Sequence, residues 1–426
     1  MARGGKDRTV VGIDVGTTKV CALIGEVSRD DSVHIIGVGV APSRGLRKGV
    51  VVNIDEAVES IGTAVARAER VSGYKIVSGY VGIAGGHITS MNNRGVVAVS
   101  QEDRSIAEED VLRAIEAARV INIPSNREII HSIPRHFIVD GQEGVRNPVG
   151  MLGYRLDVDA HIVTCAVTAM QNLVKCVHKL GIEVDEVVLE SLAASEACLT
   201  EEEKEMGVLL ADIGGGTTAL SIFIEGSVWH TSVLPVGGNH VTNDVAVGLR
   251  SPFAVAEEIK VVHGHALAST VDPSEEVEIT TFGRTEKEPV SRQRVCEIIE
   301  ARMQEIFQLV QQEVKRSGYE GLLPAGVVLT GGACELAGAA DLAREILQVP
   351  VRIGLPFGIH GLVDSISSPS FATSVGLLLW GARYGDKPAL SQSALGHMSL
   401  GRSMRKEEAP LDAVSRLRSW LKAFLP

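Results

Sequence analysis

Aromatic residues are scarce in this sequence and account for only 4% of its 426 residues. A hydrophobic core must therefore be built mainly from valine, isoleucine, leucine and alanine. Many runs are rich in valine and isoleucine, which favours strands that are buried on both faces. The fractions of hydrophobic (45%) and charged (22%) residues are those of an ordinary globular protein. At about 100–200 residues per domain, the length predicts two to four domains.

Basic residues are fewer than acidic ones. The chain has 41 Lys and Arg against 53 Asp and Glu, a formal net charge of −12. Because proteins that bind nucleic acid more often carry a basic surface, we expect no nucleic-acid partner.

Closely spaced cysteines are also absent. The six cysteines form no CxxC pair and no zinc-type cluster, and most lie beside apolar residues. This pattern predicts small buried thiols in a reducing compartment. They are Cys21, Cys165, Cys176, Cys198, Cys296 and Cys334.

Long hydrophobic runs are missing too. No run reaches the roughly 18–20 apolar residues that span a bilayer, and the most apolar stretch near the C-terminus, 375–380, is far shorter. The first nine residues lack the apolar segment of a secretory signal. We therefore expect a cytoplasmic protein, unless another feature ties it to a surface.

Two stretches about 200 residues apart repeat one pattern: an apolar strand, an aspartate, a turn of Gly and Thr, and a second apolar strand. The first turn is DVGTT at 14–18, and the second is DIGGGTT at 212–218. Each predicts a β-hairpin, and the repetition predicts an internally duplicated α/β architecture with two lobes. Neither turn matches the Walker A or the Rossmann pattern.

Both turns have the chemistry of a phosphate-binding loop. Small residues let backbone N–H groups approach phosphate oxygens, and threonine hydroxyls add donors. A single loop could be a simple glycine hairpin, but two matched copies favour a bound Mg²⁺–ATP between the lobes. The expected phosphate ligands are Gly16, Thr17, Thr18, Lys19, Gly214, Gly215, Gly216, Thr217 and Thr218. The expected Mg²⁺ ligands, acting through water, are Asp14 and Asp212.

The two loops resemble the phosphate motifs of the actin, Hsp70 and sugar-kinase superfamily. VLTGGA at 328–333 resembles its adenosine motif, which implies that Gly331, Gly332 and Ala333 lie against the nucleoside. The resemblance also implies that Glu257 and Lys260 bracket the nucleoside. Glu190 stands where bacterial actins carry the residue that orients the attacking water; the alternative is an exposed carboxylate at the start of a helix.

The helical signals are clearest in three places. Asn53 and Gly73 are suited to begin and end a helix over 53–72. Ser105 and Glu108 predict a capping box for a second helix. Apolar spacing predicts a long amphipathic helix over 290–317. The expected organisation is a first-lobe core (8–86, 165–205) with an inserted small α+β subdomain (87–164), a second-lobe core (206–233, 319–364) with an outer subdomain (234–318), a first-lobe closing helix (365–385), a flexible linker (386–410) and a terminal helix (411–426).

The terminal segment 411–426 predicts an amphipathic helix. Its charge is +2, from three basic residues and one acidic residue, on a chain that is −12 overall. A basic face beside a bulky apolar face suits a helix that lies in anionic lipid, whereas docking on the protein's own core or in a partner's groove is the alternative. The residues expected to contact the membrane are Leu411, Val414, Arg416, Leu417, Arg418, Trp420, Leu421, Lys422, Phe424 and Leu425.

Three classes of the superfamily compete. A sugar-type kinase needs an aspartate as base, and no segment is assignable to that role. An Hsp70-type chaperone would carry a β-rich substrate domain, where this chain has a linker and a short tail. We therefore favour a nucleotide-dependent scaffold of the actin type. We expect a slow ATPase at most.

The whole pattern resembles the FtsA family of bacterial cell-division actins over nearly the entire chain. PilM, a pilus-assembly protein, is similar in the core, but the terminal helix is not expected in it. The resemblance implies ATP binding, head-to-tail polymerisation, and a peripheral position on the inner face of the cell membrane at the division site. It also implies other division partners at 87–164.

The resemblance further implies that the outer subdomain holds the C-terminal peptide of FtsZ. The segment IIEARMQE at 298–305 matches the peptide-binding stretch, which puts forward Arg302 and Glu305 as contacts. The family more often has proline where Ala301 stands. The alternative is a solvated, charged helix face.

Overall fold

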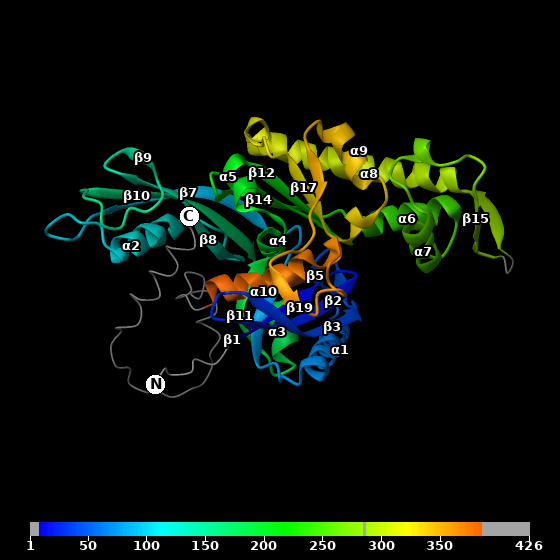
Figure 1. The fold of residues 1–426 in the computed structure, drawn as a ribbon, viewed down its shortest axis with the longest axis horizontal. Coiled ribbons are helices and arrows are strands. Elements are labelled where there is room, and N and C mark those ends of the chain that lie inside the picture. Colours follow the sequence, from blue (N-terminus) through cyan, green and yellow to red (C-terminus); the bar gives the residue numbers. More distant parts are fainter. Residues whose placement is uncertain (1–7, 284–286, 386–426) are drawn as a thin grey trace.

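The computed structural model describes residues 8–283 and 287–385. These residues form two lobes joined at the centre, with one subdomain projecting at each end of the molecule (Figure 1). The predicted terminal helix and the linker before it lie outside the described residues. Within the described residues, no helix is long and apolar enough to cross a membrane.

The first lobe is built on a six-stranded sheet. The predicted hairpin forms from β1 and β2 and lies at the centre of this sheet, and all of β1 after its first two residues is buried. Helix α1 packs on β2 and β3, and α10 packs on β1, β2 and β6. The strands, from one edge to the other, are β11 (Glu183–Leu189), β6 (Ser78–Ile83), β1 (Arg8–Val15), β2 (Lys19–Val27), β3 (Val33–Pro42) and β19 (Ile359–Gly361).

Three helices and a small hairpin complete this lobe. Asn53 accepts hydrogen bonds from the N–H groups of Asp55 and Glu56 at the start of α1, and Gly73 ends the helix with a φ of 71°. Both predicted helix signals are therefore confirmed. The elements are β4 (Leu46–Arg47), β5 (Val50–Val51), α1 (Ile54–Ser72), α3 (Val167–His178) and α4 (Glu190–Cys198).

The second lobe repeats the topology of the first. Its five-stranded sheet also has a central antiparallel hairpin, β12 and β13, whose first strand pairs in parallel with β17 just as β1 pairs with β6. The predicted duplication is therefore confirmed. The strands, in order across the sheet, are β14 (Ser227–Leu234), β13 (Thr218–Ile224), β12 (Val208–Ile213), β17 (Val327–Thr330) and β18 (Val351–Ile353).

An outer helical subdomain extends from this lobe, on the right in Figure 1. Its longest helix, α8, begins at Arg292 rather than at the predicted position 290, because Val290 pairs with Val277 in a short hairpin. The elements of the second lobe's helical part are α6 (Gly238–Leu249), α7 (Phe253–His263), β15 (Glu276–Ile279), β16 (Glu288–Ser291), α8 (Arg292–Ser317) and α9 (Ala339–Leu347).

The inserted subdomain is a four-stranded antiparallel sheet with one helix, and it projects on the left in Figure 1. The predicted capping box is wrong: α2 begins at Glu108, and the carboxylate of Asp110 accepts from the N–H of Ala107. Ser105 instead pairs with Leu152 in a β-bridge, which keeps its backbone extended. The elements are β7 (Thr89–Ala98), α2 (Glu108–Arg119), β8 (Arg127–Val139), β9 (Gln142–Val145) and β10 (Arg155–Ala166).

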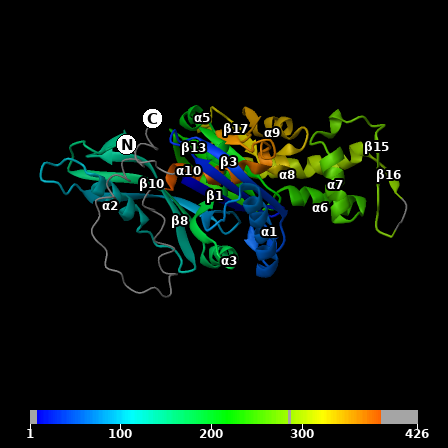
Figure 2. The same cartoon turned by 60° about the horizontal axis from the view of Figure 1, so that its bottom comes forward.

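This subdomain also contacts the second lobe. The hydroxyl of Ser90 donates to the carbonyl of Thr231 at 2.7 Å, and a ring nitrogen of His161 lies 3.0 Å from the Thr231 hydroxyl. Thr231 lies on β14, so the insertion contacts the second lobe as well. Figure 2, turned by 60° from Figure 1, shows the inserted subdomain projecting at one end of the molecule.

Two helices cross between the lobes. Helix α4 follows β11 of the first-lobe sheet and contacts β12 and β13 of the second lobe, whereas α10 (Ala372–Tyr384) packs on the first-lobe sheet and reaches Asp212 of the second lobe through the hydroxyl of Thr373. The two helices also pack against each other. The lobes are therefore joined at their centre by packed helices.

All six cysteines are buried, as predicted.

Candidate functional site

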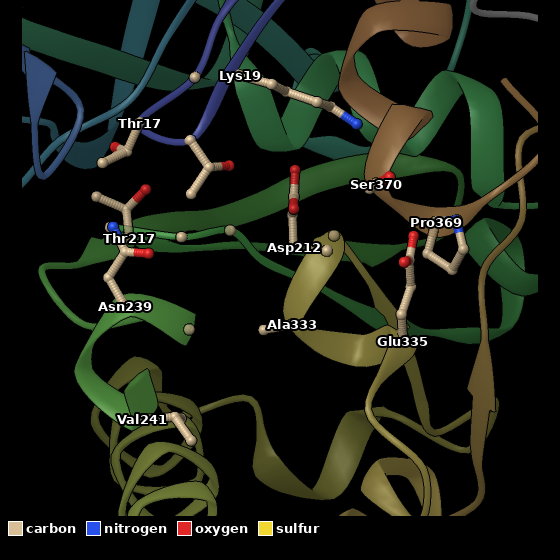
Figure 3. A pocket seen from close by; sticks show the side chains of 18 of the residues that line it. Thr17, Lys19, Asp212, Thr217, Asn239, Val241, Ala333, Glu335, Pro369 and Ser370 are labelled. Carbon is tan, nitrogen blue, oxygen red and sulfur yellow. The ribbon is translucent and has the colours of Figure 1, made fainter. Parts of the chain in front are cut away.

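A cavity of about 400 Å³ lies between the two lobes. Both glycine-threonine loops line it, together with the turn after β17 that contains Gly331, Gly332 and Ala333. In Figure 3, Thr17 of the first loop lies near Thr217 of the second, with Ala333 and Glu335 further along the same hollow. Sixteen of the seventeen residues predicted for nucleotide, metal and catalysis line it. The exception is Thr218, which is fully buried and donates its hydroxyl to the carbonyl of Val236.

The two loops are packed directly against each other. A side chain at Gly216 would place its Cβ 2.6 Å from the Thr17 hydroxyl, and one at Gly215 would place it 2.4 Å from Cγ2 of Thr18. Only glycine fits at such distances. The loops therefore form one shared surface on which backbone N–H groups of both lobes are available to a single polyphosphate.

Asp14 and Asp212 end the first strands of the two hairpins and are both buried. The hydroxyl of Ser374 donates to Asp14 at 2.7 Å, and the hydroxyl of Thr373 donates to Asp212 at 2.8 Å. Burial raises the pKa of Asp14, while the Ser374 hydrogen bond and the nearby Lys19 oppose that rise. Burial likewise raises the pKa of Asp212 to about 6.

Glu190, at the start of α4, joins these two carboxylates at the cavity wall. Burial, and then the charges of Asp14 and Asp212, raise its pKa well above the ordinary value. Glu190 is partly buried and borders the cavity, which favours a role in the site over an exposed helix-start carboxylate.

The carboxylates suit a divalent cation held through water. Burial disfavours the charged form of these neighbouring carboxylates, and a cation that joins them stabilises that form. Among residues 8–283 and 287–385, no set of three metal-binding side chains converges closely enough to hold a metal directly. Mg²⁺, which keeps several of its waters, is a cation of this kind.

Lys19 carries the cationic charge of the first loop. Its Nζ lies 3.4 Å from the centroid of the Phe371 ring, and burial lowers its pKa while Asp14 opposes that change. The ammonium group thus lies at the cavity wall beside the carboxylates, within a cavity that also holds both loops.

The residues predicted to contact the nucleoside lie on the outer subdomain and on the turn after β17. Lys260 donates to Glu257 at 2.8 Å and to the Thr242 hydroxyl at 2.8 Å, which fixes the pair between α7 and α6. Gly331 has a φ of +87°, and its Cα faces Asp212 so closely that an added Cβ would lie 2.4 Å from Oδ1. The predicted nucleoside residues and the phosphate loops are thereby brought to one cavity.

Several residues that line the cavity belong to none of the nucleotide motifs predicted from the sequence. Asn239 lies in the first turn of α6, where N–H groups of Gly238 and Asn239 donate to the second loop. The Gly-Gly-Asn triplet that starts this helix was a usable signal. The others that the sequence left unassigned are Gly49, Gly238, Val241, Val261, Met303, Glu335, Leu336, Pro369, Ser370 and Thr373.

Arg302 and Glu305 lie on α8, outside this cavity. Arg302 Nε donates to Asp244 of α6 at 2.5 Å, and its guanidinium also pairs with Glu305. Arg302 is therefore part of a carboxylate-bonded network rather than a free surface cation. The residues predicted to contact the membrane, within 411–426, lie outside the described residues.

The fold and the cavity define an actin-like protein. The structure of a PilM–PilN type IV pilus biogenesis complex is similar, with a TM-score of 0.64 and 16% identity over 88% of this chain and 98% of that one. MreB5 of Spiroplasma citri, solved with ADP bound, gives a TM-score of 0.54 with 15% identity over 88% of this chain and 96% of that one. At these identities the likeness shows the fold alone, and the expected fold class is confirmed.

Sequence comparison identifies the family. A family model for cell division protein FtsA matches residues 209–376, and one for the SHS2 domain inserted in FtsA matches 85–164. Cell division protein FtsA of Pseudomonas aeruginosa is 45% identical over 99% of both chains. That of Escherichia coli K12 is 38% identical over 97% of this chain and 98% of its own. The chain belongs to the FtsA family of cell division proteins.

Proposed function

We propose that this division protein binds ATP with Mg²⁺ between its lobes and acts as a nucleotide-dependent membrane adaptor for FtsZ. The observation that carries the nucleotide part is the convergence of two matched loops on one cavity, with an aspartate from each lobe held by consecutive residues of α10. Loop N–H groups and Lys19 would bind phosphate, Asp14 and Asp212 would hold the metal's waters, and Glu257 with Lys260 would bracket the nucleoside.

The same site supports slow hydrolysis at most. Glu190 faces the two aspartates and would orient a water beside the terminal phosphate. Burial beside two other carboxylates favours the protonated form of Glu190, and a protonated carboxyl cannot accept a proton from water until a cation offsets the neighbouring charges. The site is suited to stay occupied and hold the lobes in one arrangement.

We infer that the segment 411–426 anchors the protein to anionic lipid. The support is its sequence pattern: seven bulky apolar residues on one side of the predicted helix and a charge of +2. Anchored molecules would lie at the inner face of the membrane at the division site, where they would associate head to tail.

The FtsZ peptide would bind beside α8. Charge-assisted hydrogen bonds between Arg302 and acidic groups of the peptide would provide specificity. Because Arg302 already bonds to Asp244 and Glu305, the peptide must either join this network or displace Asp244. Other division proteins would use the inserted subdomain, which exposes Leu152 (72%) and Tyr154 (65%).

Co-sedimentation with anionic liposomes tests the function in one experiment. The full chain should pellet with liposomes and carry FtsZ with it, more completely when ATP and Mg²⁺ are present. A variant lacking 411–426 should bind ATP but stay in the supernatant. Asp212→Ala should bind lipid but lose Mg²⁺–ATP in a calorimetric titration.

Each part of the proposal fails separately. Equal pelleting of the full and truncated chains would exclude the anchor. Unchanged nucleotide affinity in Asp212→Ala would exclude the metal site. Lipid binding that never carries FtsZ into the pellet would exclude the adaptor role, and fast turnover stimulated by a small hydroxyl compound would instead indicate a kinase.

A further inference from the structure

A second cavity, of about 740 Å³, lies away from the nucleotide site, where the inserted subdomain meets the first and second lobes. Strand β8, helices α4 and α5 (Glu201–Met206), the β13–β14 turn and the end of α10 enclose it. Its size is within the range of pockets that bury a ligand of several large apolar groups. The apolar residues that line it are Ile133, Phe137, Leu192, Met206, Phe223, Val228 and Trp380.

The rim of this cavity is acidic on one side. Lys204 is buried and paired with Glu196 and Glu201, while Arg146 pairs with Glu205. Two further carboxylates are exposed: Glu202 of α5 forms no ion pair in the described part of the chain, and Glu225 of the β13–β14 turn interacts electrostatically with Arg135 only. A ligand with positive charges beside an apolar face would therefore complement this rim.

The β8 wall of the cavity, beside the β13–β14 turn, offers an unused donor. The guanidinium of Arg135 stacks on Trp229, with Cζ 3.7 Å from the ring centroid, and its buried Nε has no hydrogen-bond partner among the described residues. The last carbonyl groups of a helix lack partners within that helix. The carbonyl groups at the end of a helix seated against this wall would be placed to accept from the guanidinium of Arg135.

The last helix of the described chain ends beside this cavity. Helix α10 ends at Tyr384, and Trp380, Arg383 and Tyr384 all line the cavity. The predicted linker, 386–410, has 25 residues. A flexible linker of that length has a root-mean-square span of about 28 Å, which corresponds to an effective concentration in the millimolar range. Even a weakly binding segment at its far end would therefore fill the cavity.

We propose that the segment 411–426 docks in this cavity when no membrane is present. Its predicted apolar face, with Leu417, Trp420 and Phe424, would enter the cavity, and its basic residues would face Glu202 and Glu225. The inference rests on the proposed anchor function, because the same apolar face then either fills the cavity or enters lipid. In the docked state the cavity covers the apolar face of the segment 411–426. Anionic lipid then competes with the cavity for that face.

Disulfide trapping in the full chain tests the docking. Met206 is 59% exposed on the rim, and all six native cysteines are buried, so an engineered pair reports specifically. Met206→Cys with Leu417→Cys should form an intramolecular disulfide at least about tenfold faster than Val71→Cys with Leu417→Cys, since docking raises the local concentration. Val71 is 54% exposed on α1 and does not line the cavity.

Vesicles of anionic phospholipid should slow the first pair and leave the second unchanged. Equal rates for both pairs without vesicles would overturn the docking and leave the cavity to a segment of another protein. Sedimentation of the unmodified chain measures the anchor separately. Fast trapping in a chain that does not pellet would support docking while contradicting the membrane anchor.

A charge reversal at the rim gives a second readout. Glu202→Lys should release the segment 411–426 from the cavity. The fraction of protein that pellets at limiting lipid should then rise by about two- to fivefold, which is the effect of one surface ion pair. Glu59→Lys makes the same charge change on α1, away from the cavity, and controls for general attraction to anionic lipid. Equal gains from both variants would contradict docking.

Discussion

The hydroxyl of Ser374 donates a hydrogen bond to Asp14 at 2.7 Å, across 360 positions of sequence. The preceding residue, Thr373, donates to Asp212 at 2.8 Å. The two aspartates occupy equivalent places in the two lobes, at the ends of β1 and β12. One turn of α10 therefore holds both of the carboxylates that we propose as metal ligands, and the position of each depends on the same helix.

Removing the Ser374 hydroxyl should weaken the site. In Ser374→Ala, Asp14 loses the hydrogen bond that opposes the rise in its pKa, so its ionised form becomes less favourable. We expect a loss of about 1–3 kcal/mol of stability and weaker Mg²⁺–ATP binding. Thermal unfolding and calorimetric titration measure the two effects. Ser367→Ala, at an exposed serine nearby, should match the parent.

Stability should depend on the ionisation of Asp212. Its pKa is raised to about 6 from 3.8, so the folded state holds this proton more tightly than the unfolded state. The resulting contribution, of order 3 kcal/mol, is complete below about pH 4 and is lost as the pH rises through 6. Denaturant unfolding from pH 4 to 7 should show this loss in the nucleotide-free parent. Asp212→Asn should show a shallower decline, and identical slopes would contradict the raised pKa.

Magnesium binding should have the opposite pH dependence. Ionised Asp212 is the form that holds the metal's waters, so affinity for Mg²⁺–ATP should fall by up to about tenfold per pH unit below pH 6. Titrations at pH 5, 6 and 7 measure this change. A flat profile would remove Asp212 from the metal site.

Gly331→Ala should damage the adenosine turn. Its φ of +87° disfavours any side chain, and the new Cβ would lie 2.4 Å from Asp212 Oδ1 and 2.5 Å from the carbonyl of Ile213. Gly318 has a φ of +80° with nothing within 4 Å, so Gly318→Ala carries the backbone strain without the clash. We expect about 1 kcal/mol of destabilisation for Gly318→Ala and clearly more for Gly331→Ala. Only the latter should weaken nucleotide binding.

The network around Arg302 gives a test of the FtsZ peptide site. Arg302→Glu would leave three carboxylates together and should weaken peptide binding by about tenfold or more. Asp244→Asn should strengthen it, because the guanidinium is then released from its strongest partner. Arg294→Glu, at a residue 66% exposed in its side chain on the same helix, is the control. Fluorescence anisotropy of a labelled peptide measures all three, and equal affinities would place the peptide elsewhere.

The parts of the site that the sequence could predict are local. The hairpin turns and the caps of α1 depend on neighbouring residues, so Asn53 and Gly73 could be assigned directly. Thr373 and Ser374 could not, since their partners lie 161 and 360 positions away. The prediction that Ser105 caps a helix was wrong for the same reason, because a β-bridge to the distant Leu152 fixes the backbone of Ser105. The pairing of Arg302 with Asp244 likewise depends on how α6 and α8 pack.

Helix α10 extends from the first cavity to the second. It has 13 residues, so it is about 20 Å long. Its first turn bonds to Asp14 and Asp212, while its last turn, with Trp380 and Arg383, forms part of the wall of the second cavity. A rigid helix cannot tilt at one end without displacing the other. If the two aspartates move when a phosphate binds, the same movement therefore displaces the far end of α10 at Tyr384, close to where the described part of the chain ends.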